Sequence, residues 1–263
     1  MGKITVTQLG EGTWQLHEDG VDSPVDAYLV IGEKRGVVID SLQETEELYQ
    51  RVRELTDLPL DLVLTHAHLD HVGRATDGFK NSACGVLMKH EDKDLLGIMG
   101  CFSFPEGYFQ DIEEGKVFSL GGRTLEIIPM PGHTAGSIAL LDRKNELLFS
   151  GDSIGSGPFW LQLPHSLSME TFVQSATNLL NEVEGMEDLL VLPGHRVQSR
   201  TTLGIAYVRD ILETAQLILD GTLDGEAGSL VFEGEPMNFK MAEHKSMQGF
   251  YYAPNNLLNS EEK

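Results

Sequence analysis

The sequence predicts an α/β protein, and three observations support this. The first forty residues read as short strands joined by turns, the hydrophobic spacing then changes to that of a helix, and several later apolar strands end in histidine or aspartate. The chain has 263 residues, which is long enough to bury a core without disulfides. Because no Pro/Ser-rich linker or change of composition divides it, we expect one domain over residues 1–263.

Strand and helix periodicity defines the elements of the N-terminal half. Strands are expected in ITVTQL, TWQLHE, AYLVIG and GVVIDS, with EKRG as a hairpin turn. In ETEELYQRVRELT the apolar residues Leu48, Val52 and Leu55 have helical spacing, and the strand LDLVLT follows Pro59. A second helix and strand are expected in HVGRATDGF and CGVLMKH.

The C-terminal half predicts hairpins followed by two long helices. VFSLGGRTLEIIPM and SIALLDRKNELLFSGD have the pattern of hairpin-rich sheet. Ser168 is expected to cap a helix that runs to about Glu184, and the strand LLVLPGH precedes a helix from about Thr202 to Asp220 that Gly221 can end. The tail MQGFYYAPNNLLNSEEK begins apolar and ends charged, so its last residues are expected to fray.

Charge and cysteine content exclude several classes of function. Lys plus Arg number 19 against 41 Asp plus Glu, a formal net charge of -22, which repels polyphosphate and predicts that nucleic acid is not a partner. Cys84 and Cys101 are too far apart for a zinc ribbon or redox pair, and we expect them in the core and in a loop. There is no signal-peptide pattern and no apolar run of about eighteen residues, so we expect a cytoplasmic protein without a membrane partner.

Four apolar strands end in side chains that bind metals. LTHAHLDH follows one strand, IPMPGHT and VLPGHRV each run apolar strand, Pro, Gly, His, and LLFSGDS ends a fourth strand in Gly-Asp. The side chains placed there are His66, His68, Asp70, His71, His133, Asp152 and His195. Imidazole and carboxylate are ligands of zinc, iron and manganese, and a binuclear site needs about seven such donors. The sequence therefore predicts a metal centre at the strand ends.

These motifs resemble those of the metallo-β-lactamase superfamily, whose HxHxDH signature stands here at residues 66–71 and whose later His, Asp and His follow in the same order. The resemblance extends from about residue 4 to residue 220 and implies a four-layer αββα sandwich with the site between the sheets. It implies two divalent ions, zinc or alternatively iron or manganese. The implied ligands are His66, His68 and His133 for the first metal, Asp70, His71 and His195 for the second, and Asp152 as the bridge.

A binuclear centre implies a hydrolytic reaction. Two such metals lower the pKa of a bridging water, so that a metal-bridged hydroxide can attack an acyl carbon or phosphorus. We expect Asp70 or the second metal to handle the proton and the leaving group, which makes Asp70 the predicted catalytic residue. Asp40, at the end of GVVID, resembles the family's aspartate beside the site and is a candidate partner for a ligand histidine, with a simple turn role as the alternative.

The resemblance also narrows the substrate. Asp152 stands where β-lactam-hydrolysing members have Cys or Ser, and it resembles the thioesterase, lactonase and phosphodiesterase branches. The acidic last sixty residues disfavour glutathione thioesters, and a basic tRNA exosite is absent. We expect hydrolysis of an ester, lactone or thioester of a small molecule. The alternatives are a small-nucleotide phosphodiesterase, for which Arg74, Arg196 and Arg200 lie near the motifs, and a mononuclear iron persulfide-type dioxygenase.

Two turn-rich aromatic segments, residues 98–110 and 157–165, are expected to form a lid over the site. The candidate substrate contacts are Phe104, Phe159, Trp160 and His165, with Tyr207 or Tyr251 as a further polar contact. The alternative is that these aromatic residues pack a loop onto the core or form a homodimer interface.

Overall fold

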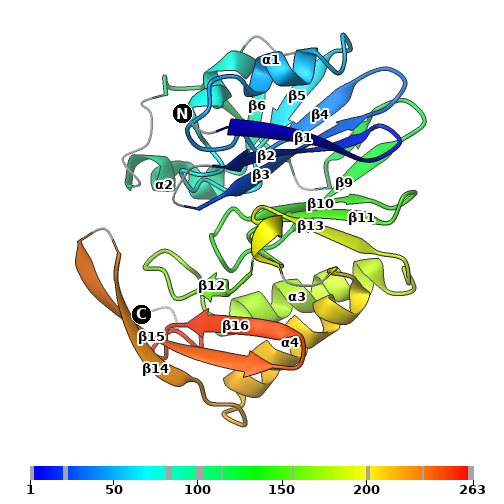
Figure 1. Cartoon of the computed structure of the whole chain (residues 1–263). Coiled ribbons are helices and arrows are strands. Elements are labelled where there is room, and N and C mark those ends of the chain that lie inside the picture. Colours follow the sequence, from blue (N-terminus) through cyan, green and yellow to red (C-terminus); the bar gives the residue numbers. More distant parts are fainter. Residues whose placement is uncertain are drawn as a thin grey trace.

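The computed structural model describes residues 3–19, 23–80, 85–98, 104–113, 115–155, 157–199, 202–232 and 234–259. Within these residues the strands form three sheets, and two of them face each other in the middle of the molecule (Figure 1). Cys84, Cys101, Phe102 and Arg200 lie outside the described residues.

The first sheet has its seven strands in chain order. They are β1 (Lys3–Gly10), β2 (Thr13–Asp19), β3 (Val25–Ile31), β4 (Gly36–Ile39), β5 (Leu60–Val63), β6 (Val86–Met88) and β7 (Phe109–Asp111). Pairing is antiparallel from β1 to β4 and parallel from β4 to β7. The parallel strands place their C-terminal ends at one edge, where ligand sites form in α/β folds.

The second sheet has the order β13-β11-β10-β9-β8. Its strands are β8 (Val117–Ser119), β9 (Thr124–Pro129), β10 (Ile138–Asp142), β11 (Leu147–Gly151) and β13 (Leu190–Pro193). The hairpins expected in residues 117–152 are confirmed, because β8, β9, β10 and β11 pair in antiparallel succession. Strand β13 is parallel to β11, so the motifs that follow these two strands emerge side by side.

Helices cover the outer faces of the two sheets, and the expected four-layer αββα sandwich is confirmed (Figure 1). The helices are α1 (Leu48–Arg53), η1 (Arg74–Phe79), η2 (His90–Asp92) and α2 (Lys93–Ile98) on the first sheet, α3 (Met169–Val183) and α4 (Ile205–Leu219) on the second, and the short η3 (Arg196–Gln198).

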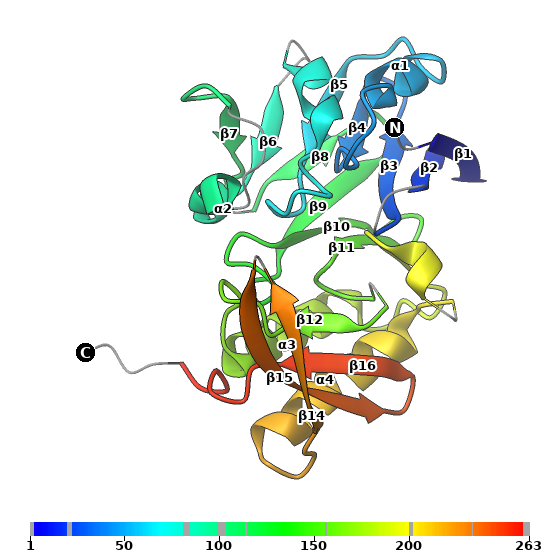
Figure 2. The ribbon, with the colours of Figure 1, turned by 60° about the vertical axis from the view of Figure 1, so that its left-hand side comes forward.

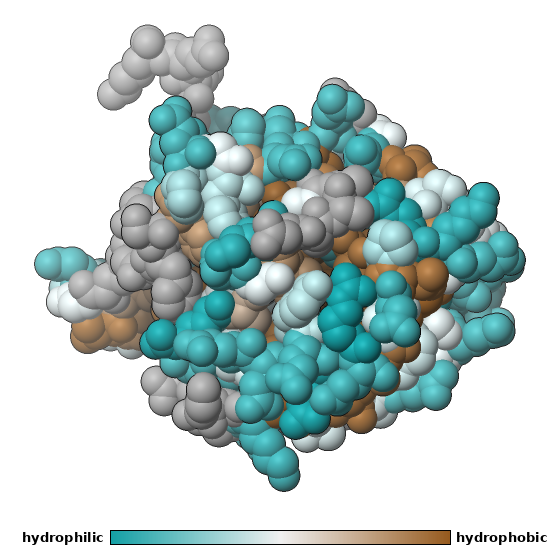
Figure 3. Space-filling view, turned by 90° about the horizontal axis from the view of Figure 1, so that it is seen from above, coloured by the Kyte–Doolittle hydropathy of each residue, from teal (hydrophilic) through white to brown (hydrophobic). Residues whose placement is uncertain are grey.

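Hydrophilic side chains cover most of the described surface on the α1 side (Figure 3). No helix in the described part of the chain is long and apolar enough to cross a membrane.

Each central strand contributes to two cores, which explains why these strands are almost continuously apolar. In β3, Ala27 and Leu29 face the helices of the first sheet, whereas Tyr28 and Val30 face the second sheet. In β11, Phe149 faces the core between the sheets, where its ring lies 5.3 Å from that of Tyr28. The inter-sheet core therefore fixes the strands from which the metal-binding motifs emerge.

The helices agree with the sequence in position and differ in detail. Ser168 caps α3 as predicted, because its Oγ accepts a hydrogen bond from Thr171 N. Helix α4 begins at Ile205, three residues after the expected start, with Gly204 at its N-cap. The helix expected in HVGRATDGF forms as the 3-10 helix η1, and its first residue is anchored where Arg74 N donates to Gln43 O.

A third sheet, which no pattern in the sequence predicts, lies beside α3 and α4 (Figure 2). Its order is β12-β16-β15-β14, with β12 (Phe159–Leu161), β14 (Glu226–Phe232), β15 (Glu235–His244) and β16 (Met247–Tyr252). The expectation of a lid in residues 98–110 is also corrected in part, since Phe109 begins β7 and completes the first sheet. Through the third sheet, the C-terminal part of the chain lies close to β12, which follows the motif of Asp152 (Figure 2).

The inter-sheet core yields a stability prediction. Because Phe149 is fully buried between the sheets, Phe149→Ala removes a large apolar side chain and leaves a cavity, which costs about 3–5 kcal/mol of unfolding free energy. Urea denaturation followed by circular dichroism measures this loss. The matched control, Val117→Ala at a side chain that is 48% exposed, should change stability by about 0.5 kcal/mol or less. Equal effects of the two substitutions would contradict this account of the core.

Candidate metal centre

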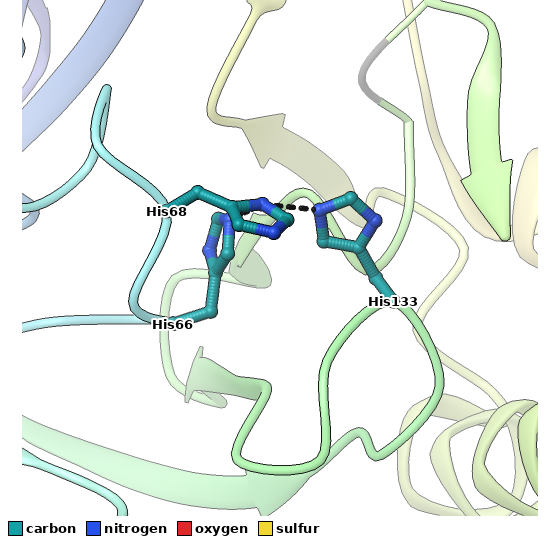
Figure 4. Close-up of side chains that lie close together, drawn as sticks. All are labelled: His66, His68 and His133. Carbon is teal, nitrogen blue, oxygen red and sulfur yellow. Dashed lines mark hydrogen bonds between the residues drawn. The ribbon is translucent and has the colours of Figure 1, made fainter. Parts of the chain in front are cut away.

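The four motif loops meet where the ends of the two central sheets come together. The loop after β5 carries His66, His68, Asp70 and His71, and three strands of the second sheet lead to the remaining side chains. His133 follows β9, Asp152 follows β11 and His195 follows β13. Figure 4 shows His66 and His68 on the same loop, both turned toward His133 on another. All seven predicted donors are thus brought together.

The donors form two groups, and Asp152 lies close to histidines of both. Ligand atoms within 4.8 Å of one another define the sets His66/His68/His133, His66/His71/Asp152 and Asp70/His71/His195. In the first set, Nδ1 of His68 lies 3.0 Å from Nε2 of His66 and 2.9 Å from Nε2 of His133. In the last set, Nε2 of His195 lies 3.1 Å from Asp70 Oδ2.

Asp152 lies between the two groups. Its Oδ1 is 3.4 Å from Nε2 of His71, and its Oδ2 is 3.4 Å from Nε2 of His195 and 3.8 Å from Nε2 of His133. A single carboxylate therefore faces histidines of both groups with both of its oxygens. This is the position that a bridging ligand requires.

Hydrogen bonds on the outer side of the rings set which nitrogen faces inward. Nδ1 of His133 lies 2.6 Å from the carbonyl of Trp160, Nδ1 of His195 lies 2.7 Å from the carbonyl of Pro24, and Nδ1 of His71 lies 2.8 Å from Asp40 Oδ2. Carbonyl and carboxylate oxygens only accept, so each Nδ1 must carry the proton and donate it. In the neutral rings each Nε2 is then left with a lone pair that points to the centre.

His68 has the reverse orientation. Its Nδ1 faces His66 and His133, and its Nε2 lies 2.9 Å from Nε2 of His165. His165 is therefore placed on the outer side of His68, where it can accept the Nε2 proton of that ring, and it does not line the cavity beside the centre. Burial, followed by the proximity of His133, lowers the pKa of His165 to about 4, which keeps its ring neutral and able to accept.

The donor set fits a cation. Nε2 of His71 is buried and makes no hydrogen bond with any described residue, a costly state that a metal ion relieves. Nitrogen atoms of His66, His68 and His133 also converge at 2.9–3.0 Å, close enough together to bind one cation. Imidazole and carboxylate donors suit zinc, iron or manganese. The residues present thus match the divalent metals that the fold implies.

Burial and neighbouring charges separate the two sides of the centre. Burial, reinforced by the surrounding histidines, lowers the pKa of both His66 and His68 well below its usual range. Burial also acts to lower the pKa of His71 and His195, but Asp152 and Asp70 outweigh it and raise both values well above the usual range. Conversely, burial opposes ionisation of Asp70 and Asp152, yet His71 and His195 hold the pKa of both carboxyls well below its usual range. The centre therefore has neutral rings at His66 and His68, and imidazoles paired with carboxylates on the side of His71 and His195.

Asp40 anchors the first motif loop, so the predicted contact with a ligand histidine is confirmed. Besides accepting from His71, its carboxylate accepts Thr65 N at 2.7 Å and Thr65 Oγ1 at 2.8 Å. Oγ1 of Thr65 is in turn 3.1 Å from Nδ1 of His66. Asp40 thereby fixes ligand candidates from both groups.

Asp26 anchors the loop of His195. Its Oδ2 accepts Arg196 N at 2.8 Å, its own N–H donates to the carbonyl of Gly194 at 2.7 Å, and its Oδ1 accepts Gln15 Nε2 at 2.6 Å. A Cβ at Gly194 would lie 2.4 Å from His71 Cε1, so the Pro-Gly-His motif needs glycine there to let the loop approach the centre. Arg196 is held at Gln15 Oε1, 2.9 Å away, and Arg74 at Glu44 Oε2, 3.0 Å away.

A cavity of about 260 Å³ opens beside the centre. Its described lining residues are Ser23, His68, Asp70, His133, Asp152, Pro158, Trp160, Leu163, His195, Gln198 and Phe232. Trp160 is at the cavity as predicted and is 36% exposed. Sequence reasoning missed Phe232, because it follows the last motif by more than thirty residues and only the third sheet brings it here. Every ionisable side chain in this described lining is one of the seven donors.

The other aromatic expectations are corrected. Phe159 is buried, with its ring 4.5 Å from Phe172 and 4.9 Å from Phe250, because alternation along β12 turns it inward while Trp160 turns outward. Phe104 packs against Tyr108 and Phe109 at 4.8 Å on the edge of the first sheet's core.

Neither tyrosine considered as a polar contact lines the cavity. Tyr207 is buried in the core beneath the second sheet, where burial, followed by the charge of Asp210, raises its pKa well above its usual range. The ring of Tyr251 lies behind that of Trp160, with centroids 6.0 Å apart. Its contact with Trp160 is therefore one of packing.

The chain is similar to known proteins in sequence and in fold. The model of the "Metallo-beta-lactamase superfamily" matches residues 20–195. The chain is 33% identical over 186 residues to the hydroxyacylglutathione hydrolase GloC of Haemophilus influenzae, covering 65% of this chain and 84% of that protein. It is 29% identical over 219 residues to the acyl-coenzyme A thioesterase MBLAC2 of Gallus gallus, covering 71% and 78%. A metallo-beta-lactamase structure from Pontibacter korlensis has a TM-score of 0.66 at 18% identity, covering 81% of this chain and 99% of that one.

Metal content is the first prediction from this geometry. Because seven donors in two groups exceed the four that a single tetrahedral ion takes, the protein should bind two divalent transition metals per chain. Elemental analysis of protein reconstituted with excess zinc and then desalted measures this ratio. One metal or fewer at saturation would contradict the prediction.

The contact between His165 and His68 generates a second prediction. His165→Phe removes the acceptor on the outer side of His68, and loss of such a partner typically weakens metal binding 10–100-fold. Competition with a chromogenic chelator measures the affinity, and the absorption spectrum of the cobalt-substituted protein reports the altered ligand field. His165→Gln, which keeps an acceptor, should restore part of the affinity. If the phenylalanine variant binds metal like the unaltered protein, His165 does not position His68.

Proposed function

Because the chain belongs to the metallo-β-lactamase superfamily, we propose that it is a binuclear metal-dependent hydrolase that cleaves the thioester bond of a small acyl compound. The observation that carries this proposal is the convergence of seven donors beside a cavity whose lining also includes the apolar side chains of Pro158, Trp160, Leu163 and Phe232. Such a cavity offers an acyl group an apolar surface and presents its carbonyl to the donor cluster.

The two metal sites follow the grouping of the donors. His66, His68 and His133 would hold one ion, Asp70, His71 and His195 the other, and Asp152 would contact both. Two divalent ions, which we propose to be zinc, supply an activated water at neutral pH and polarise a carbonyl oxygen. The protein keeps the rings in the tautomers that such ions need, through Asp40, Trp160 O and Pro24 O.

Asp70 has the best position to handle a proton during the reaction. It lines the cavity and is 23% exposed, whereas His71 behind it is fully buried. Its Oδ2 is held by His195, and the carboxylate can accept a proton from the attacking water at the cavity floor. We therefore keep Asp70 as the proposed catalytic residue.

The cavity favours a thiol leaving group. Among the described lining residues there is no acid other than the seven donors, so a departing alkoxide would have no separate proton donor. A thiol has a pKa of about 8.5 and can leave as the thiolate without one. Two relatives are named as a hydroxyacylglutathione hydrolase and an acyl-coenzyme A thioesterase, which are activities on thioesters, and this supports the same choice.

A nucleotide phosphodiester is the less favoured substrate. The described lining of the cavity contains neither lysine nor arginine, and both Arg74 and Arg196 make side-chain bonds elsewhere. A phosphodiester would therefore approach the centre without a protein cation to pair its charge, in a chain whose net charge is -22.

A substrate panel tests the proposal. With zinc-loaded protein, kcat/KM for a butanoyl thioester should exceed that for the matched ester and lactone by at least about tenfold, and that for a phosphodiester or β-lactam by at least about 100-fold. The same panel with Asp152→Ala should show a loss of at least about 100-fold with the circular dichroism spectrum unchanged, whereas His90→Ala, at a side chain that is 55% exposed, should keep full activity. Efficient phosphodiester cleavage without thioester cleavage would overturn the proposal.

A further inference from the structure

A second hollow adjoins the cavity of the candidate metal centre. This groove, of about 700 Å³, is lined by residues 162–164, Ser166, Phe232, residues 235–238 and residues 253–256. Leu163 and Phe232 line both the groove and the metal cavity, so the two spaces meet at these side chains. A substrate that has its scissile bond at the metals can therefore extend past Leu163 and Phe232 into the groove.

The groove contains an unpaired buried amide. Gln162 is only 2% exposed, and neither its Oε1 nor its Nε2 makes a hydrogen bond with any described residue. Burying an amide without a partner costs about 1–3 kcal/mol, so a protein seldom keeps one unless something pairs with it. The side chain offers one acceptor and a donor group, which is what an amide on a ligand pairs with.

The backbone of β15 offers the same chemistry along another wall. Strand β15 pairs with β14 from Glu235 onward, but its pairing with β16 begins only at Lys240. Over residues 235–238 the edge that faces away from β14 therefore has no partner strand among the described residues. Such an edge can hydrogen-bond an extended chain that carries amides.

The charge of the groove limits what that chain can be. Glu235 is the one ionisable side chain among the described lining residues, and the remainder are apolar side chains, prolines, serine and amides. A thiol with carboxylate groups, such as glutathione, would meet Glu235 and no cation. A neutral arm with amides can form hydrogen bonds with the amide side chains of the lining.

We infer that this groove is the subsite for the thiol arm of the substrate, and that it selects a neutral arm containing amides, such as pantetheine, with Gln162 and the free edge of β15 as its hydrogen-bonding partners. The inference rests on the proposed thioesterase function and specifies its leaving group. Gln162 acts here as a specificity residue away from the metal centre.

Matched thioesters test the subsite. Butanoyl thioesters of pantetheine, glutathione and 2-mercaptoethanol share the acyl group and differ in amides and charge. With zinc-loaded protein, kcat/KM for the pantetheine thioester should exceed both others at least about tenfold, the effect of one or two well-placed hydrogen bonds. Gln162→Leu should lower the pantetheine value about tenfold and leave the mercaptoethanol value within about twofold. The control Gln174→Leu, on the exposed face of α3, should change neither.

Binding of an uncleavable analogue separates this inference from the proposed function. The thioether S-butylpantetheine, measured by calorimetry, should bind the unaltered protein about tenfold more tightly than Gln162→Leu. If no thioester is cleaved but the thioether binds in this manner, the proposed reaction fails and the subsite stands. If thioesters are cleaved but Gln162→Leu weakens all of them equally, or none, the subsite is overturned and Gln162 has only a structural role.

Discussion

The structure depends on holding seven candidate metal-binding side chains within a few ångströms of one another. Nδ1 of His68 faces two other imidazole nitrogens at 2.9–3.0 Å, and Nε2 of His71 is buried without a hydrogen bond to any residue that the structure describes. Such an arrangement is unfavourable by itself and becomes favourable around cations. The surrounding fold must therefore supply the rigidity that keeps these side chains in place.

That rigidity comes from buried acceptors placed behind the rings. Asp40 joins the end of β4 to Thr65 and His71, while Asp26 joins β3 to the loop of His195. Both aspartates are at most 2% exposed, and the hydrogen bonds that they accept from Thr65, His71 and Arg196 tie motif loops to the first sheet. The inter-sheet core, with Phe149 and Tyr28 in contact, then holds the two sheets at a fixed separation. Positioning of the site and stability of the fold thus use the same residues and strands.

The space for a substrate has a different origin. The match to the superfamily ends at residue 195, and the third sheet lies largely beyond it. Strand β12 contributes Trp160 to the cavity, the hairpin of β14 and β15 contributes Phe232, and the same hairpin lines the adjoining groove with Gln162. The part shared with the superfamily therefore supplies the candidate metal-binding side chains, whereas the C-terminal part of this chain shapes the space beside them.

The sequence by itself determined the sandwich, the main helices and the seven donors, because these depend on local patterns. Strand alternation, the Ser168 cap and the short spacings in HxHxDH and Pro-Gly-His act within a few residues. The tertiary structure decided which aromatic side chains line the cavity. Phe159 and Trp160 are adjacent, and the sequence favours neither of them as a cavity residue. The pairing of β12 with β16 turns Phe159 into the core and Trp160 toward the cavity. His165 and Phe232 likewise acquire their roles from contacts with residues far away in the chain, through long-range packing that no local spacing encodes.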